Sequence, residues 1–292
     1  MSLARALGTG TEGPAMNPQG ALRDELIAHL ERTRVLRDPR IAAALRAVDR
    51  HRFVPTATPE EAYEDKALAI KERDGLVLSS ISQPSMIVHM LELLAVRPND
   101  RVLEIGTGSG YNAALLAELA NEGTVVSVEI EPDLIENARA TLVEQGYGHV
   151  VLVHADKLGE IQRPFDRIVV TARSHDIDPD WWRLLAPGGR IVVPLDIGYG
   201  GERAIGFVRS GDRLQSVGSY ACAFVELRGN VSVPDTPMFF RTRAARYDRE
   251  PSPTTPLDVV AVERTRADTS LLESADAVVA RPYTLFAVTR AS

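Results

Sequence analysis

The chain has 292 residues, of which 45% are hydrophobic and 25% are charged, a composition that suits a globular protein of one or two domains. Its net charge of −7 argues against general nucleic-acid binding, because phosphate neutralisation needs a clustered basic surface. No apolar run reaches the roughly 18 residues of a membrane span, no signal-peptide pattern opens the chain, and the single cysteine, Cys222, excludes an internal disulfide. These features predict a cytoplasmic protein with no membrane, nucleic-acid or metal partner, and with a monomer as the favoured state.

The N-terminal part divides into a tail and a helical segment. Residues 1–20 contain glycine and proline without periodicity, which predicts a flexible tail. Apolar residues then recur at helical spacing in 22–30 and again in 41–48, which predicts two amphipathic helices ahead of the main fold.

The segment SSISQP, residues 79–84, precedes a helix whose apolar positions between Ile87 and Leu94 share one face. Pro84 suits the first helical turn, and from the residues alone Ser82 or Gln83 is expected to cap the free amides of the helix.

The most informative stretch is RVLEIGTGSGYNAA, residues 101–114. An apolar strand, Val102 to Ile105, leads through Gly106, Gly108 and Gly110 into a helix, and this pattern predicts a nucleotide-binding turn whose amides face a ligand. A glycine-rich turn formed for packing alone is the alternative.

Two acidic residues narrow the choice of ligand. Glu129 follows a second strand, Val125 to Val128, and lies 19 positions after Gly110, close to the spacing at which a carboxylate binds ribose hydroxyls. Glu104 would repel a pyrophosphate but would attract a cationic amino-acid group. The pair therefore favours S-adenosylmethionine over NAD, with a surface charge as the alternative interpretation of Glu104.

The rest of this region predicts further strands at 150–153, 165–171 and 190–194, alternating with helices, and then a hairpin formed by 205–209 and 214–217. Alternation of this kind predicts a largely parallel sheet with helices on both faces. A ligand is expected at the carboxyl ends of the strands, where Glu104, Glu129, Asp156 and Thr171 fall.

At these residues the chain resembles the protein-L-isoaspartate O-methyltransferases. The motifs are ISQP (81–84), EIGTGSGYNAALLA (104–117), PFDRIVVTA (164–172) and LAPGGRIVVP (185–194), and they occur in family order across about 40–228. The resemblance implies a Rossmann-like S-adenosylmethionine methyltransferase domain at 21–228, after a tail at 1–20 and before a C-terminal α/β extension at 229–292.

The resemblance also implies roles for individual residues. Ser82 would lie beside the transferred methyl group and orient the acceptor carboxylate, which replaces its interpretation as a helix cap. Asp156 would contact the adenine amino group, although Ala155 and Lys157 stand where the family has glycines. The full set expected to bind S-adenosylmethionine, and its product S-adenosylhomocysteine, is Ser80, Glu104, Gly106, Thr107, Gly108, Ser109, Gly110, Glu129, Ile130, Asp156, Lys157 and Thr171.

The C-terminal extension leaves open which carboxylate accepts the methyl group. It predicts strands at 257–262, 275–280 and 283–288, and its run FFRTRAARYDR (239–249) is either a solvated loop or a clamp for an acidic peptide. One hypothesis is methylation of isoaspartyl or aspartyl side chains of proteins, giving an ester that collapses to succinimide.

The alternative is a dedicated enzyme that methylates one aspartate of a ribosomally made, cyclised peptide and so forms an aspartimide. The extension and the departure from family residues at Ser85 favour this alternative. A cofactor-binding adaptor without catalysis and an NAD-dependent oxidoreductase are hypotheses of other classes, and Ser82, Glu104 and Glu129 argue against them.

Overall fold

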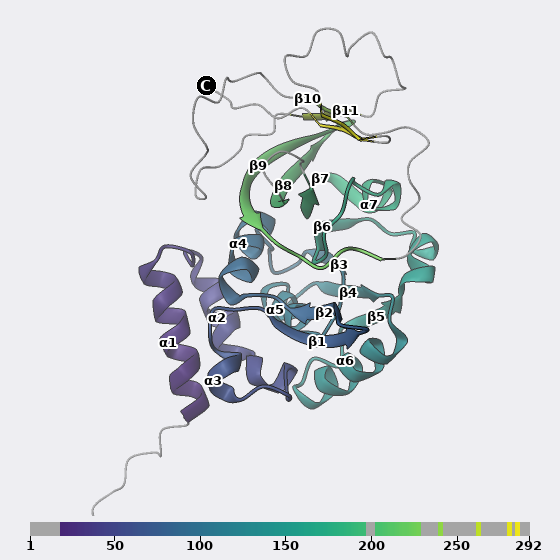
Figure 1. Cartoon of the computed structure of the whole chain (residues 1–292). Helices are drawn as coiled ribbons and strands as arrows, with labels where there is room; N and C mark the ends of the chain where they lie inside the picture. The colour runs from purple at the N-terminus through teal and green to yellow at the C-terminus, as the bar shows by residue number, and fades with distance from the viewer. Residues whose placement is uncertain are drawn as a thin grey trace, which may run out of the picture.

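The computed structural model describes residues 18–196 and 202–228 in full, together with the backbone of four short strands further along the chain (Figure 1). These four strands are β10 (Phe239–Arg241), β11 (Ala261–Glu263), β12 (Val279–Arg281) and β13 (Thr284–Phe286). Most of the expected tail, and the 242–249 part of the arginine- and aromatic-rich run, lie outside the described residues.

A single sheet organises the fold. Its parallel part has the order β7-β6-β3-β4-β5, and β8 and β9 extend it as antiparallel strands. The strands are β3 (Arg101–Ile105), β4 (Thr124–Glu129), β5 (Val151–His154), β6 (Phe165–Val170), β7 (Leu185–Asp196), β8 (Glu202–Ser210) and β9 (Arg213–Cys222). The predicted mostly parallel sheet is confirmed.

Helices cover both faces of this sheet, as the alternation of buried side chains requires. Val102 packs in the core on the side of α2, α4 and α5, whereas its neighbour Leu103 packs on the side of Trp181 in α7. The helical elements are α1 (Pro18–Arg32), α2 (Pro39–Ala47), η1 (Arg50–Phe53), α3 (Pro59–Ala62), α4 (Pro84–Leu94), α5 (Tyr111–Leu119), α6 (Pro132–Glu144), η2 (Ala155–Glu160) and α7 (Pro179–Leu184).

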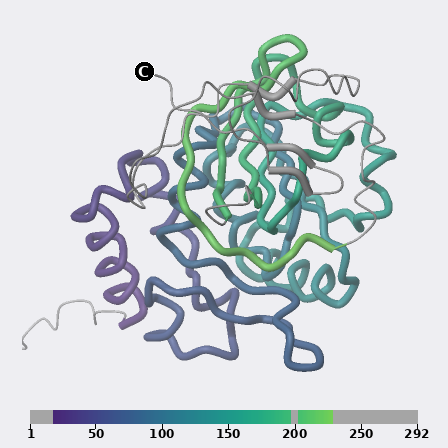
Figure 2. The backbone as a smooth tube through the Cα atoms, turned by 45° about the horizontal axis from the view of Figure 1, so that its top comes forward, coloured from purple at the N-terminus to yellow at the C-terminus, as the bar shows by residue number. Residues whose placement is uncertain are grey.

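A separate hairpin, β1 (Leu68–Arg73) with β2 (Leu76–Ile81), lies outside the main sheet and was not predicted. Its two-residue turn is Asp74-Gly75, with φ of 53° and 77°. Both values suit the left-handed turn that an Asp-Gly pair favours between strands, so the signal was present in the sequence. Figure 2 shows the hairpin running beside the segment that follows β9.

The start of α4 corrects one sequence interpretation. The N-cap residue is Gln83, whose side chain makes no capping hydrogen bond, and Ser82 precedes it, so the expectation that either residue caps the helix was wrong. Asp65 serves instead: its Oδ1 accepts from the Ser85 amide at 2.8 Å, and its Oδ2 accepts from Gln83 Nε2 at 3.1 Å. The cap comes from a distant loop, which leaves the Ser82 hydroxyl available.

One boundary also differs from expectation. Strand β7 begins at Leu185, ahead of the predicted 190–194, and includes Pro187–Gly189, because Gly188 at φ 73° lets the strand continue through a register shift. Further along, β11 to β13 overlap the three strands predicted in the extension, and β11 pairs with β9 through Val262 opposite Leu214.

We expect Asp65→Ala to lower the free energy of unfolding by about 1 kcal/mol, the usual cost of losing a helix cap. Urea denaturation at 25 °C measures the change. Asp24→Ala, which removes an exposed carboxylate of α1, is the matched control, and equal effects of the two substitutions would contradict the capping role.

Candidate active site

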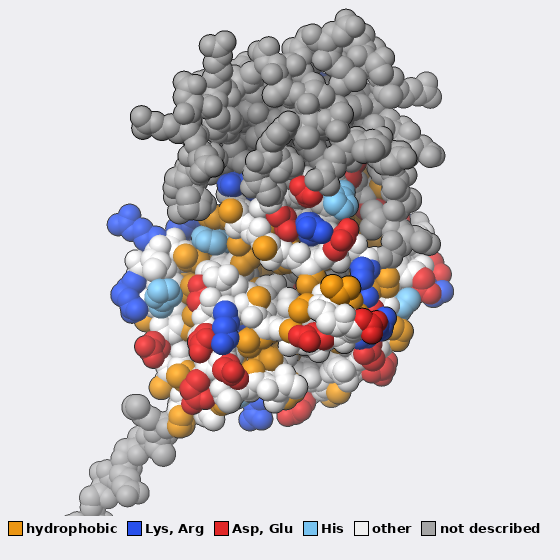
Figure 3. All heavy atoms as spheres, in the orientation of Figure 1, with side chains coloured by type: hydrophobic (Ala, Val, Ile, Leu, Met, Phe, Trp, Pro, Cys, Tyr) orange, Lys and Arg blue, Asp and Glu red, His pale blue; other side chains and the backbone are white. Residues whose placement is uncertain are grey.

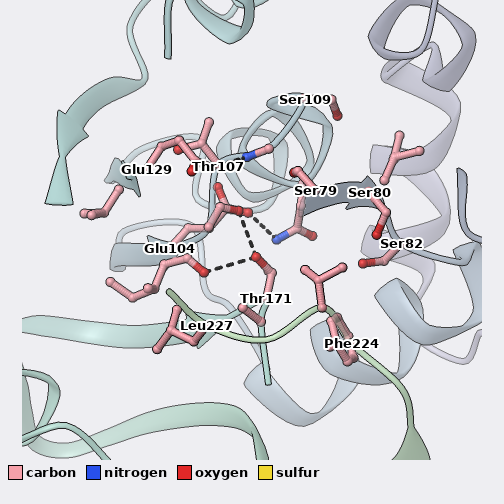
Figure 4. Close-up of a pocket in the computed structure, with 18 of the residues that line it drawn as sticks. Ser79, Ser80, Ser82, Glu104, Thr107, Ser109, Glu129, Thr171, Phe224 and Leu227 are labelled. Carbon is pink, nitrogen blue, oxygen red and sulfur yellow. Dashed lines mark hydrogen bonds between the residues drawn. The ribbon is translucent and has the colours of Figure 1, made fainter. Parts of the chain in front are cut away.

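A pocket opens at the carboxyl ends of the parallel strands, where chain order reverses between β3 and β6. Open α/β sheets bind ligands at such a switch point. The glycine turn after β3 and the ends of β4 and β6 form its floor. Residues 78–82 and the segment Phe224–Arg228, here called the strap, form its walls. Figure 4 shows Glu129 on one side of the cavity and Ser80 and Ser82 on the other.

The glycine turn depends on Gly106. Its φ is 102°, and a Cβ added there would lie 2.4 Å from Thr171 Oγ1, so only glycine fits. The Thr171 hydroxyl contacts the carbonyl oxygens of Gly106 at 2.8 Å and Ile105 at 3.0 Å. Thr171 therefore supports the turn through these two hydrogen bonds.

Glu129 is held in one orientation by backbone amides. Its Oε2 accepts from Gly108 N at 2.9 Å, and its Oε1 accepts from Ile130 N at 2.9 Å and Glu131 N at 3.1 Å. The side chain is buried, yet it lines the pocket. Oε1 already accepts two hydrogen bonds and Oε2 accepts one, so Oε2 keeps capacity to accept from a hydroxyl group of a ligand.

Glu104 occupies a different environment. It is fully buried, and it accepts hydrogen bonds from Asn112 Nδ2 at 2.8 Å and Ser127 Oγ at 2.5 Å. Burial raises the pKa of Glu104 to about 7, and the two hydrogen bonds offset only part of that rise. Among the described residues its hydrogen-bond partners are both neutral, so the Glu104 carboxylate suits a cationic group of a ligand.

Ser82 lies at the wall that β2 and α4 form. It is half-buried, it lines the pocket, and within the described part of the chain its hydroxyl has no hydrogen-bond partner. Figure 4 places it near Phe224 of the strap. A hydroxyl that is free to donate at a pocket wall can orient an anionic group there.

Comparison with known proteins adds the family. The model of the protein-L-isoaspartate(D-aspartate) O-methyltransferases matches residues 21–232. The chain belongs to this family. A protein-L-isoaspartate O-methyltransferase of Methanoculleus marisnigri is 44% identical over 175 residues, which cover 59% of this chain and 76% of the relative. A relative of the same name from Picosynechococcus is 36% identical over 220 residues, covering 73% and 93%.

Solved structures with a similar fold include members of the same family. One titled protein-L-isoaspartate O-methyltransferase has a TM-score of 0.65 and 27% identity, and the match covers 74% of this chain and 72% of that one. A Plasmodium falciparum structure in complex with S-adenosyl-L-homocysteine has a TM-score of 0.61 at 20% identity, covering 70% and 98%, and it supports the fold alone. As a member of the family, this chain is a methyltransferase that uses S-adenosylmethionine.

Most of the predicted cofactor residues come together in the pocket. The lining includes Ser80, Glu104, Gly106, Thr107, Gly108, Ser109, Glu129, Ile130 and Thr171. Gly110 does not line the pocket but begins α5 at φ 86°, where a Cβ would press on Leu142 of α6 at 3.2 Å. The absence of a side chain at Gly110 allows close packing of α5 and α6, and its predicted contact with the cofactor stays a prediction.

Asp156 and Lys157 are not among the lining residues. The Asp156 carboxylate contacts His154 Nδ1 at 2.8 Å, its side chain is 63% exposed, and the hydrogen bond with His154 lowers the pKa of Asp156. Ala155 lines the pocket in their place. The proposed adenine contact of Asp156 stays a prediction.

Two parts of the site were missed by sequence reasoning. Asn112, the second residue of α5, donates a hydrogen bond to Glu104, and its position eight residues after an expected strand-end carboxylate was the available signal. The strap was not assigned to the pocket, because only the fold brings it across the strand ends. Figure 1 shows this segment crossing in front of β3.

Within the described residues, no helix is both long and apolar enough to span a bilayer, and no group of three or more His, Cys, Asp or Glu side chains could hold a metal ion. In Figure 3 basic and acidic side chains intermingle on the described part of the visible face. The expected absence of nucleic-acid partners stays a prediction.

Glu104 predicts how the stability of the ligand-free protein depends on pH. The native protein holds a proton that the unfolded chain releases near its ordinary pKa of 4.5, so the free energy of unfolding falls as pH rises towards 7. We expect this decrease, on the order of 2 kcal/mol, to be absent in Glu104→Gln. Urea denaturation at pH 5 and pH 8 measures it, and equal pH dependence in both proteins would contradict the assignment.

Proposed function

We propose that this protein-L-isoaspartate O-methyltransferase methylates isoaspartyl or aspartyl side-chain carboxylates of proteins or peptides, and that the methyl ester then collapses to a succinimide. The observation that carries the proposal is the Ser82 hydroxyl, which has no partner in the described chain and lies across the pocket from the Glu104 and Glu129 carboxylates.

We assign the cofactor contacts from the chemistry of each side chain. Glu129, fixed by three amides, would accept from the ribose hydroxyls, and Glu104 would balance the charge of the amino group. The amides of the turn at 106–109 would face the same ligand. When bound, S-adenosylmethionine supplies an electrophilic methyl group on its sulfonium.

The acceptor side needs orientation more than proton transfer. A side-chain carboxylate with an ordinary pKa near 4 is ionised at neutral pH, so no general base is required. Ser82 would donate a hydrogen bond that aims one acceptor oxygen, while Ile87, Met90 and Phe224 supply apolar surface to the same pocket. Such positioning can contribute on the order of 7–11 kcal/mol when the geometry is ideal.

The second candidate function is the dedicated modification of one aspartate in a ribosomally made peptide, leaving an aspartimide. What favours it is the extension, whose strand β11 pairs with β9, the strand that continues into the strap. A segment attached in this way could select a particular peptide. The division at 228, a cytoplasmic location and a monomeric state remain predictions.

We expect Ser82→Ala to lower kcat with little change in the affinity for S-adenosylmethionine, because the hydroxyl orients the acceptor only. Steady-state kinetics and calorimetric titration of the cofactor measure the two quantities. Thr141→Ala, which removes a hydroxyl from α6 outside the pocket lining, is the matched control. Equal losses of turnover and cofactor affinity in Ser82→Ala would assign a structural role to Ser82.

The acceptor is tested with labelled S-adenosylmethionine and two short unstructured peptides that differ only in aspartate or isoaspartate. Labelling of the isoaspartyl peptide alone is the result expected for a repair-type enzyme. Labelling of neither peptide, with cofactor binding confirmed, would favour the dedicated peptide-modifying function.

A further inference from the structure

The loop between β4 and α6 carries a charged cluster beside the pocket. Glu131 immediately follows the lining residues Glu129 and Ile130, and it is the N-cap residue of α6. Its side chain makes no capping hydrogen bond to its own helix, so its carboxylate is directed to other elements. The contacts of the Glu131 carboxylate are separate from the proposed contacts with the cofactor and the acceptor.

Three elements that are distant in sequence meet at this carboxylate. Lys71 of β1 donates to Glu131 Oε2 at 2.5 Å, and Arg228 at the end of the strap donates to Glu131 Oε1. Arg228 also donates to the Leu78 carbonyl of β2 at 3.4 Å. Arg228 therefore joins the two walls of the pocket, and Glu131 joins both to the loop beneath.

The contacts are sheltered from solvent. The side chains of Lys71 and Glu131 are only 14% and 13% exposed, and that of Arg228 is 33% exposed. Hydrogen bonds from Lys71 and Arg228 lower the pKa of Glu131 to about 2, so this carboxylate stays ionised throughout the pH range of ordinary assays. Charge-assisted hydrogen bonds of this kind are stronger than neutral ones.

The same residue acts on the pocket through its backbone. The Glu131 amide donates to Glu129 Oε1 at 3.1 Å, which is one of the three bonds that orient the carboxylate assigned to the ribose. The side chain of Glu131 thus holds the hairpin and the strap, and its backbone amide holds the Glu129 carboxylate. Movement of the strap or hairpin is linked to the orientation of Glu129.

We propose that Lys71, Glu131 and Arg228 form a clasp that closes the cofactor pocket, in which Glu131 is a positioning residue that controls release of the cofactor. The proposal rests on the proposed cofactor site. With the clasp formed, the hairpin and the strap stay joined over the pocket. The cofactor leaves when Arg228 separates from Glu131 and Leu78.

Dissociation of labelled S-adenosylmethionine from the full-length protein, chased with unlabelled cofactor in the absence of peptide, tests the clasp. Glu131→Gln keeps the amide that holds Glu129 but removes the charge, and Arg228→Gln removes the connection between the walls. We expect each to speed dissociation about tenfold and to raise KM for the cofactor, while kcat at saturation is retained. Arg228→Lys, which keeps a cation, should recover part of the effect.

Glu136→Gln is the matched control, because it removes an exposed carboxylate from α6 that lies 3.9 Å from Arg139. It should dissociate at the wild-type rate. If the wild-type protein binds S-adenosylmethionine but the dissociation rates of Glu131→Gln and Arg228→Gln stay within about twofold of the wild-type rate, the clasp alone is overturned. No binding of S-adenosylmethionine by the wild-type protein would overturn both the clasp and the proposed cofactor site.

Discussion

The interaction on which the site depends is the set of hydrogen bonds between the Glu129 carboxylate and the amides of Gly108, Ile130 and Glu131. One carboxylate joins the turn after β3 to the loop after β4, so two separate loops become a single surface. Because three amides already bind it, this carboxylate is oriented before any ligand arrives, and little orientational freedom is left to lose on binding.

Three glutamates within a short distance of the pocket show how environment sets chemistry. Glu104 is buried with neutral donors, and its pKa is raised to about 7. Glu131 accepts hydrogen bonds from Lys71 and Arg228 and lies 3.6 Å from the Arg73 guanidinium, and its pKa is lowered to about 2. Glu129 is held by amides alone. Glutamate side chains in three environments thus provide a site for a cation at Glu104, a permanent ionic contact at Glu131 and a rigid hydrogen-bond acceptor at Glu129.

The sequence predicts the parts of this site that local chemistry determines. Gly106, Glu104 and Glu129 could be found because strand, turn and helix follow one another within a few residues, and the parallel sheet follows from their repetition. The Asp74-Gly75 turn is also determined locally, because an Asp-Gly pair favours the left-handed turn of a hairpin.

Asp65 and Arg228 could not be found in this way. Asp65 acts on an amide 20 residues away, and Arg228 acts on a carboxylate 97 residues away. Neither partnership leaves a pattern in the neighbouring residues, and both require the packed fold. Asp156 differs from both, because its partner His154 lies only two residues away and Ala155 and Lys157 replace the glycines of the family.

Strand β9 connects two places where a substrate could be recognised. Its first residues pair with β11, and the chain beyond its last residue enters the strap. The ten residues from Arg213 to Cys222 separate these regions by roughly 30 Å when extended. A peptide that follows β9 from β11 to the strap would therefore span on the order of nine extended residues. For such a peptide, the length between its recognised sequence and its modified residue would itself be a criterion of selection.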